Sequence, residues 1–245
     1  MLESLSAIRE PRTRAAKARR VLVEADPERA ARAMFLAIVK VRQSGNVEAA
    51  MALDAITVAL TTKRGLPYAA RSAMYGAATR QGLGVVARLF FEASSAATSA
   101  PPPSEEPELE RPAKPGGKPL PLGHRTYLAR QSRDDSLRAL ARDPHPAVIA
   151  SVLQNSSITE RDVLAIASRR PTEPNSQLAV FSCDRWRVRH AVRRALALNP
   201  HTPVALAARI MTTLRDADLR DIARDPGLSS TLARHARELE ELKRR

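Results

Sequence analysis

The sequence predicts an all-α fold, and its composition provides the first two observations. Apolar residues make up 44% of the chain and aromatic residues only 3%, so a core must be built from Ala, Leu, Val and Ile. Ala and Leu are strong helix formers, and Arg follows them closely. No run of alternating β-branched residues, the usual signature of a strand, opposes this assignment.

A repeated phrase is the third observation. Residues 137–144 read LRALARDP and residues 219–226 read LRDIARDP, with six of the eight positions identical. A looser pair is NSSIT at 155–159 and NPHTP at 199–203. Repeated units that cannot bury their apolar faces alone stack on one another and form a solenoid. We therefore expect an N-terminal helical bundle over 1–94 and a C-terminal α-solenoid of short repeats over 122–245.

Start and stop signals divide the N-terminal bundle into helices. Asp26 followed by Pro27 is an N-cap followed by a proline at the first helical position, and Gly45 is a typical helix stop. Asn46 is the N-cap of the next helix, and Pro67 opens another. The expected helices span 11–24, 27–44, 46–62, 67–82 and 83–92. Because the loops between them are short, neighbouring helices should run antiparallel.

Residues 95–121 interrupt the helical pattern with eight prolines. Proline removes a backbone donor and breaks helices, and too few apolar residues remain here to form a core. We expect a flexible linker between two helical domains. Its acidic cluster over 105–110 is either solvated or folded back onto the basic domains.

Capping signals also define helices within residues 122–245. The two Asp-Pro pairs, 143–144 and 225–226, are interpreted as an N-cap followed by a first-turn proline. Thr159 and Asp162 form a capping-box pattern before an apolar run. We therefore expect helices to begin at each of these places.

Asn155 and Asn199 lie where two of the expected helices end. Asn tolerates the left-handed conformation that closes a helix, and Pro200 blocks continuation. The repeating unit is thus a short helix, an Asn-led turn, a second short helix and an Asp-Pro turn.

The stretch 192–209 (VRRALALNPHTPVALAAR) resembles the leucine-rich repeat variant family, whose unit runs Val-Arg, a small apolar helix, Asn-Pro-x-Thr-Pro and a Leu-rich helix. Residues 148–167 resemble a looser second copy, and the Asp-Pro pairs resemble HEAT-like repeats. The resemblance covers about residues 137–240 and implies a right-handed superhelix that serves as a scaffold for partner binding. A member of that family holds an iron–sulfur cluster through cysteines, a property not transferred here because Cys183 is the chain's single cysteine.

The expected helix 185–198 contains the candidate binding surface. At 100° per residue, Val188 belongs to an apolar stripe, whereas Trp186 lies on the opposite side among arginines. Trp186 has the spacing for a cation–π contact with Arg189 or Arg193. The candidate partner-binding residues are Arg185, Trp186, Arg187, Arg189, Arg193 and Arg194. The alternative is that Trp186 packs against neighbouring helices and takes no part in recognition.

These features favour a non-enzymatic scaffold or adaptor. Arginine's planar fork pairs bidentately with carboxylates, so we expect a protein partner with an acidic surface. The alternative is a nucleic-acid-binding protein that uses both basic domains, since the chain has a net charge of +14 and a pI of about 11.1. The charge is spread along the chain, and 34 Arg against 6 Lys is also the bias of a GC-rich genome.

No residue pattern indicates a catalytic site, a metal site or a cofactor. The five histidines are scattered, and no pair has the i, i+4 spacing of a helical zinc site. The single cysteine excludes an internal disulfide framework and favours a reducing compartment. We expect no membrane span, because no uncharged apolar stretch reaches about 18 residues, and no signal peptide. A cytoplasmic protein of undetermined oligomeric state is therefore expected.

Overall fold

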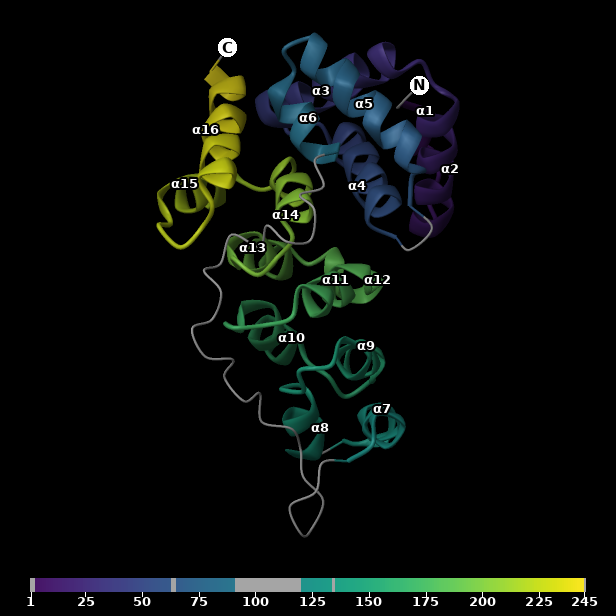
Figure 1. Cartoon of the computed structure of the whole chain (residues 1–245), viewed down its shortest axis with the longest axis vertical. Helices are drawn as coiled ribbons and strands as arrows, with labels where there is room; N and C mark the ends of the chain where they lie inside the picture. The colour runs from purple at the N-terminus through teal and green to yellow at the C-terminus, as the bar shows by residue number, and fades with distance from the viewer. Residues whose placement is uncertain (1–2, 63–64, 91–119, 134, 245) are drawn as a thin grey trace. The chain divides into compact units, whose positions relative to one another are not determined.

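The structure is a computed structural model that describes residues 3–62, 65–90, 120–133 and 135–244. Over these residues the chain forms sixteen helices and no strand, which confirms the all-α class (Figure 1). Most of the expected linker, 95–119, lies outside the described residues. The helices form two compact units: unit 1 comprises α1 to α6 with α14 to α16, and unit 2 comprises α7 to α13. None of these helices is long and apolar enough to cross a bilayer.

The first helices of unit 1 follow the local signals in the sequence. The Asp26 carboxylate accepts a hydrogen bond from the Arg29 N–H at 2.8 Å, and α3 ends at Gly45 with a φ of 64°. The Asn46 side chain accepts from the Ala49 N–H at 2.8 Å and caps α4. The bounds are α1 (Glu3–Ser6), α2 (Pro11–Glu24), α3 (Pro27–Ser44), α4 (Val47–Thr61), α5 (Tyr68–Arg80), α6 (Gly84–Phe90), α14 (Val204–Met211), α15 (Asp216–Arg224) and α16 (Ser230–Arg244). The helix starts expected at 27 and near 46 are confirmed.

α4 is the central helix of unit 1. It packs against α1, α2, α3 and α14. A helix that is apolar around its whole circumference is a core helix. The buried Thr57 hydroxyl donates to the Leu53 carbonyl at 2.8 Å, so its polar group is satisfied. The buried residues of α4 are Ala49, Ala52, Leu53, Ala55, Ile56, Thr57, Ala59 and Leu60.

α14 and α16 complete unit 1, although they follow unit 2 in the sequence. α14 packs against α4 and α6, and α16 packs against α3 and α6. Arg42 of α3 donates to the carbonyls of Leu214 and Leu239 at 2.7 and 3.2 Å, and it pairs with Asp216. This grouping differs from the division drawn from the sequence, which assigned 122–245 to one domain. The apolar faces of α14 and α16 are buried against the N-terminal helices, which explains the difference.

Unit 2 is built from short helices. α7 packs against α9 and α9 against α11, which makes one row, while α10 packs against α13 (Figure 1). The capping box of Thr159 and Asp162 at the start of α10 is confirmed. The bounds are α7 (Leu122–Gln131), α8 (Asp135–Leu140), α9 (Pro146–Gln154), α10 (Glu160–Ser168), α11 (Pro174–Ser182), α12 (Asp184–Arg187) and α13 (His190–Leu198).

Two asparagines tie the ends of neighbouring helices together in unit 2. The Asn155 amide donates to the carbonyls of Ala129 and Ser132 at the end of α7, at 2.9 and 2.8 Å. The Asn199 amide makes the equivalent pair of bonds at the end of α10, at 2.8 Å each. Each side-chain oxygen accepts from the N–H two residues later. Both residues end helices as expected, but their backbones are extended rather than left-handed (φ −67° and −88°).

The expectation that the two Asp-Pro pairs begin helices is wrong. α9 begins at Pro146 with His145 as its N-cap, and α16 begins at Ser230. Asp143 and Asp225 instead follow α8 and α15, and each carboxylate accepts from the N–H two residues later at 2.8 Å. Such a side-chain turn competes with the helix and stops it. The repeated phrase therefore marks the end of a helix.

Candidate functional site

The expected helix 185–198 is two helices in the structure. α12 ends at Arg187, and α13 starts after Arg189, whose backbone is extended (φ −76°, ψ 124°). The break changes which residues face the core. Val188 is 58% exposed instead of lying in a buried stripe, while α13 buries Val192 and Leu196.

Trp186 is a core residue of unit 2. It is only 3% exposed, and its indole N–H donates to the Leu153 carbonyl in the last turn of α9 at 3.1 Å. This is the packing that the alternative interpretation of Trp186 expected. Its cation–π partner is Arg185, whose guanidinium carbon lies 4.4 Å from the ring centroid. The prediction of Arg189 or Arg193 as the partner requires one continuous helix over these residues, whereas the structure has two helices, α12 and α13.

Arg187 is also buried, at 2% exposure, and its Nε donates to the Asp184 carboxylate at 3.0 Å. A buried guanidinium requires a hydrogen-bonded counter-charge, and Asp184 supplies one. Trp186 and Arg187 therefore hold the α12–α13 turn in place and offer little surface to a partner.

The other four predicted residues are accessible, and we call them the arginine turn. Arg185 and Arg189 are exposed, and Arg193 and Arg194 are half-buried. The Arg185 guanidinium donates to the Asn155 carbonyl at 3.3 Å, which fixes its position over the neighbouring turn. The Arg189 side chain has no hydrogen-bond or ion-pair partner within the described part of the chain.

Cys183 lies directly before α12, and its environment does not favour reactivity. The thiol is buried and contacts the Leu153 carbonyl at 3.7 Å. Burial raises the pKa of the Cys183 thiol, so it stays protonated at neutral pH. The expectation of a small core residue agrees with this placement.

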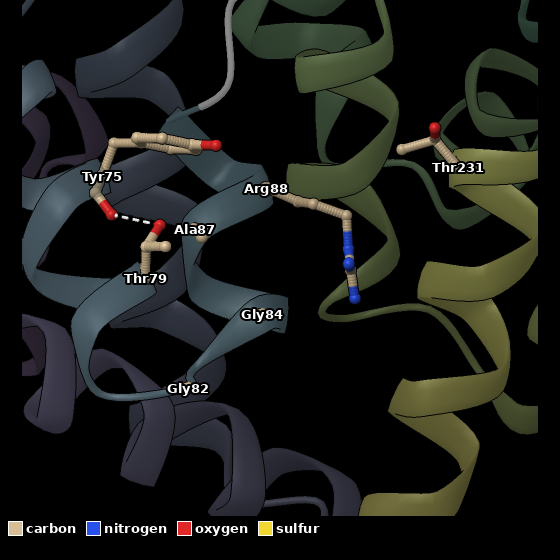
Figure 2. Close-up of a pocket in the computed structure, with 7 residues that line it drawn as sticks. All are labelled: Tyr75, Thr79, Gly82, Gly84, Ala87, Arg88 and Thr231. Carbon is tan, nitrogen blue, oxygen red and sulfur yellow. Dashed lines mark hydrogen bonds between the residues drawn. The ribbon is translucent and has the colours of Figure 1, made fainter.

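Sequence analysis missed an open pocket of about 420 Å³ in unit 1. It lies between α5, the turn that follows α5, α6 and α16 (Figure 2). No local motif marks it, because its walls converge only when α16 packs against α6. Two glycines close together in one turn were the single hint in the sequence. The lining residues are Tyr75, Thr79, Gly82, Gly84, Ala87, Arg88 and Thr231.

A metal centre is not apparent within the described ranges, where no group of three His, Cys, Asp or Glu side chains could hold a metal ion. The molecule is thus an all-helical protein with an arginine turn in unit 2 and a pocket in unit 1. Comparison with protein-family models, with curated proteins and with solved structures finds no match to the chain. The resemblance to leucine-rich repeat variant and HEAT-like repeats stays an expectation from the residues.

Proposed function

We propose that the protein is a non-enzymatic scaffold that binds a protein partner with an acidic surface through the arginine turn. The main observation behind this proposal is the environment of the Arg189 side chain. Its side chain is exposed at the bend between α12 and α13 and pairs with no described residue. Beneath it, Trp186 and Arg187 are fixed by hydrogen bonds. An arginine on a rigid turn keeps its planar fork for a carboxylate at a small entropic cost.

The charge of unit 2 supports an acidic partner. Residues 120–203 contain 13 arginines and 7 acidic residues. Three of those carboxylates already have arginine partners inside the unit, because Asp135 pairs with Arg138, Asp143 with Arg125 and Asp184 with Arg187. The positive excess would steer an acidic surface toward unit 2 and would weaken as salt is added.

We further propose that unit 2 is a helical repeat of the leucine-rich-variant or HEAT-like type. The equivalent hydrogen bonds of Asn155 and Asn199 support this proposal, because repeated residues perform the same task at two places. The packing of α7, α9 and α11 in one row supports it as well. Helical repeats of this kind present extended binding surfaces.

Nucleic-acid binding is the competing function, and the fate of the buried arginines counts against it. Phosphate binding requires accessible cations. At least seven buried or half-buried guanidinium groups donate to carbonyls or carboxylates of the chain itself: Arg14, Arg42, Arg88, Arg125, Arg169, Arg187 and Arg209. The charge available to phosphates is therefore smaller than the net charge of +14 suggests.

Charge reversal at the turn tests the proposal. Arg189→Glu keeps the fold, because an acidic residue at a helix N-terminus is favourable. We expect partners captured from a host lysate by the wild-type chain to be lost with Arg189→Glu and with Arg189→Glu/Arg193→Glu. The matched control is Arg130→Glu, an exposed arginine in the last turn of α7. Identical captured sets for all variants would overturn the proposal.

A measurement of binding to duplex DNA distinguishes the competing function from the proposed one. We expect no binding of random duplex DNA at about 0.15 M salt, measured by fluorescence anisotropy. Micromolar binding with a steep log–log salt dependence would favour a nucleic-acid-binding protein instead.

A further inference from the structure

We propose that the pocket of unit 1 binds a small organic anion, in which a carboxylate or phosphate group adjoins a flat apolar body. Its volume of about 420 Å³ matches the usual size of small-molecule sites, roughly 300–1,000 Å³. Figure 2 shows the Tyr75 ring and Thr79 on the α5 side, and the Arg88 side chain reaching from α6 toward α16. The proposed site is independent of the arginine turn.

Two residues of α16 hold the Arg88 side chain in one orientation. Its Nε donates to His235 Nδ1 at 3.0 Å, and its Nη2 pairs with Glu238. His235 Nε2 lies 3.1 Å from the Ala208 carbonyl. Because a carbonyl only accepts, Nε2 carries the ring proton and Nδ1 is free to accept from Arg88. The third nitrogen, Nη1, has no hydrogen-bond partner in the part of the chain that the structure describes.

The charges around the pocket leave room for an anion. Glu238 neutralises one cation, but Arg234 of α16 lies near Arg88, is exposed and has no described partner. Burial and the nearby charge of Arg234 both lower the pKa of Arg88. Two cations thus share one carboxylate at this edge, and a ligand oxyanion beside Nη1 would balance the excess.

Gly84 keeps the approach to Arg88 open. A Cβ at this position would lie 3.6 Å from Arg88 Nη1 and 3.6 Å from a Glu238 carboxylate oxygen. A methyl group fits at these distances, but the branches of a larger side chain would occupy the space beside Nη1. The Tyr75 ring, 40% exposed, offers a flat wall for the apolar part of the ligand. Thr231 adds a hydroxyl from α16.

The test titrates the full-length protein with benzoate, phenyl phosphate and neutral benzamide in saturation-transfer NMR. We expect binding of an anion with a dissociation constant on the order of 1 mM, as befits so small a probe, and no binding of benzamide. Tighter binding of benzoate or of phenyl phosphate identifies the group that the pocket prefers. Binding of neither anion, or equal binding of benzamide, would overturn the proposal.

Variants distinguish the pocket from other surfaces. Gly84→Val should weaken anion binding at least tenfold without loss of fold, because valine's helix propensity is no lower than that of glycine. Arg234→Gln should weaken it by about threefold, since a screened surface charge contributes modestly. The control Arg130→Gln removes an exposed arginine from unit 2 and should leave binding unchanged. Equal affinities for the wild type, Gly84→Val and Arg234→Gln would refute the assignment to this pocket.

Discussion

Buried and half-buried arginines in this protein commonly donate to backbone carbonyls in the last turn of a helix or just beyond it. The last four carbonyls of a helix lack intrahelical partners, and a guanidinium offers five donors in a fixed plane. Arg42 donates to Leu214 beyond α14, and Arg209 donates to Leu89 in α6 at 2.6 Å. Arg209 is so deeply buried that desolvation, with Arg71 nearby, lowers its pKa to about 9. Lysine lacks the planar fork, so the arginine bias has a structural use besides any effect of genome composition.

His235 makes stability sensitive to acid. Burial, and then the charge of Arg88, lower its pKa to about 3, whereas the unfolded chain should titrate near the ordinary value of 6.5. Below pH 6.5, His235 therefore binds a proton in the unfolded state but stays neutral in the folded state. The contribution of neutral His235 to the stability of the fold is complete above pH 6.5. It is lost as pH falls toward 3, by up to about 1.4 kcal/mol per pH unit.

Urea unfolding at pH 7 and pH 5 measures this effect. In His235→Gln the amide can accept from Arg88 and donate to the Ala208 carbonyl, but it cannot titrate. We expect the wild type to lose more stability than this variant between the two pH values, by roughly 1–2 kcal/mol. Equal losses would mean that His235 does not titrate as inferred.

At the scale of elements, the sequence predicted what local chemistry determines. Asp26 and Asn46 cap helices, and Gly45 stops one, because each acts on backbone groups within a few residues. The break between α12 and α13 was not predictable in this way. It accompanies the burial of Trp186 against the end of α9, a contact between segments 33 residues apart. The pocket and the joining of α16 to α3 depend on still more distant contacts, which leave no periodic signal.

The turns formed by Asn155 and Asn199 should contribute measurably to the stability of the fold. In Asn199→Ala, the buried carbonyl of Ala167 and the partly buried carbonyl of Arg169, both at the end of α10, lose their donor. We expect a loss of about 2–4 kcal/mol in the free energy of unfolding, since each unsatisfied buried group costs about 1–3 kcal/mol. Asn155→Ala should behave alike, whereas Asn175→Ala, exposed on α11, should change stability by less than about 0.5 kcal/mol. Chemical denaturation that ranks Asn175→Ala with the other two would contradict the proposed role of these turns.

At the scale of the whole molecule, unit 1 is assembled from both ends of the chain. Leu206, Ile210 and Met211 of α14 are buried, as are Leu232 and Leu239 of α16. These residues pack against helices that precede them by some 150 residues in the sequence, as the Arg88–Glu238 pair shows. Closing so long a loop adds little entropic cost, because the cost grows only with the logarithm of loop length. The N-terminal helices therefore have a core that they cannot complete alone.

Fragments test this dependence. Residues 1–94 alone should melt at a much lower temperature, or without cooperativity, because the fragment exposes the surface that α14 and α16 cover. Joining 1–94 to 204–245 through a flexible Gly/Ser linker of about 15 residues should restore a cooperative transition. The matched control carries the same linker and a tail in which Leu232 and Leu239 are replaced by Ser, which removes the apolar face of α16. Circular dichroism melts in which 1–94 alone equals the fusion would show that the N-terminal helices form an independent domain.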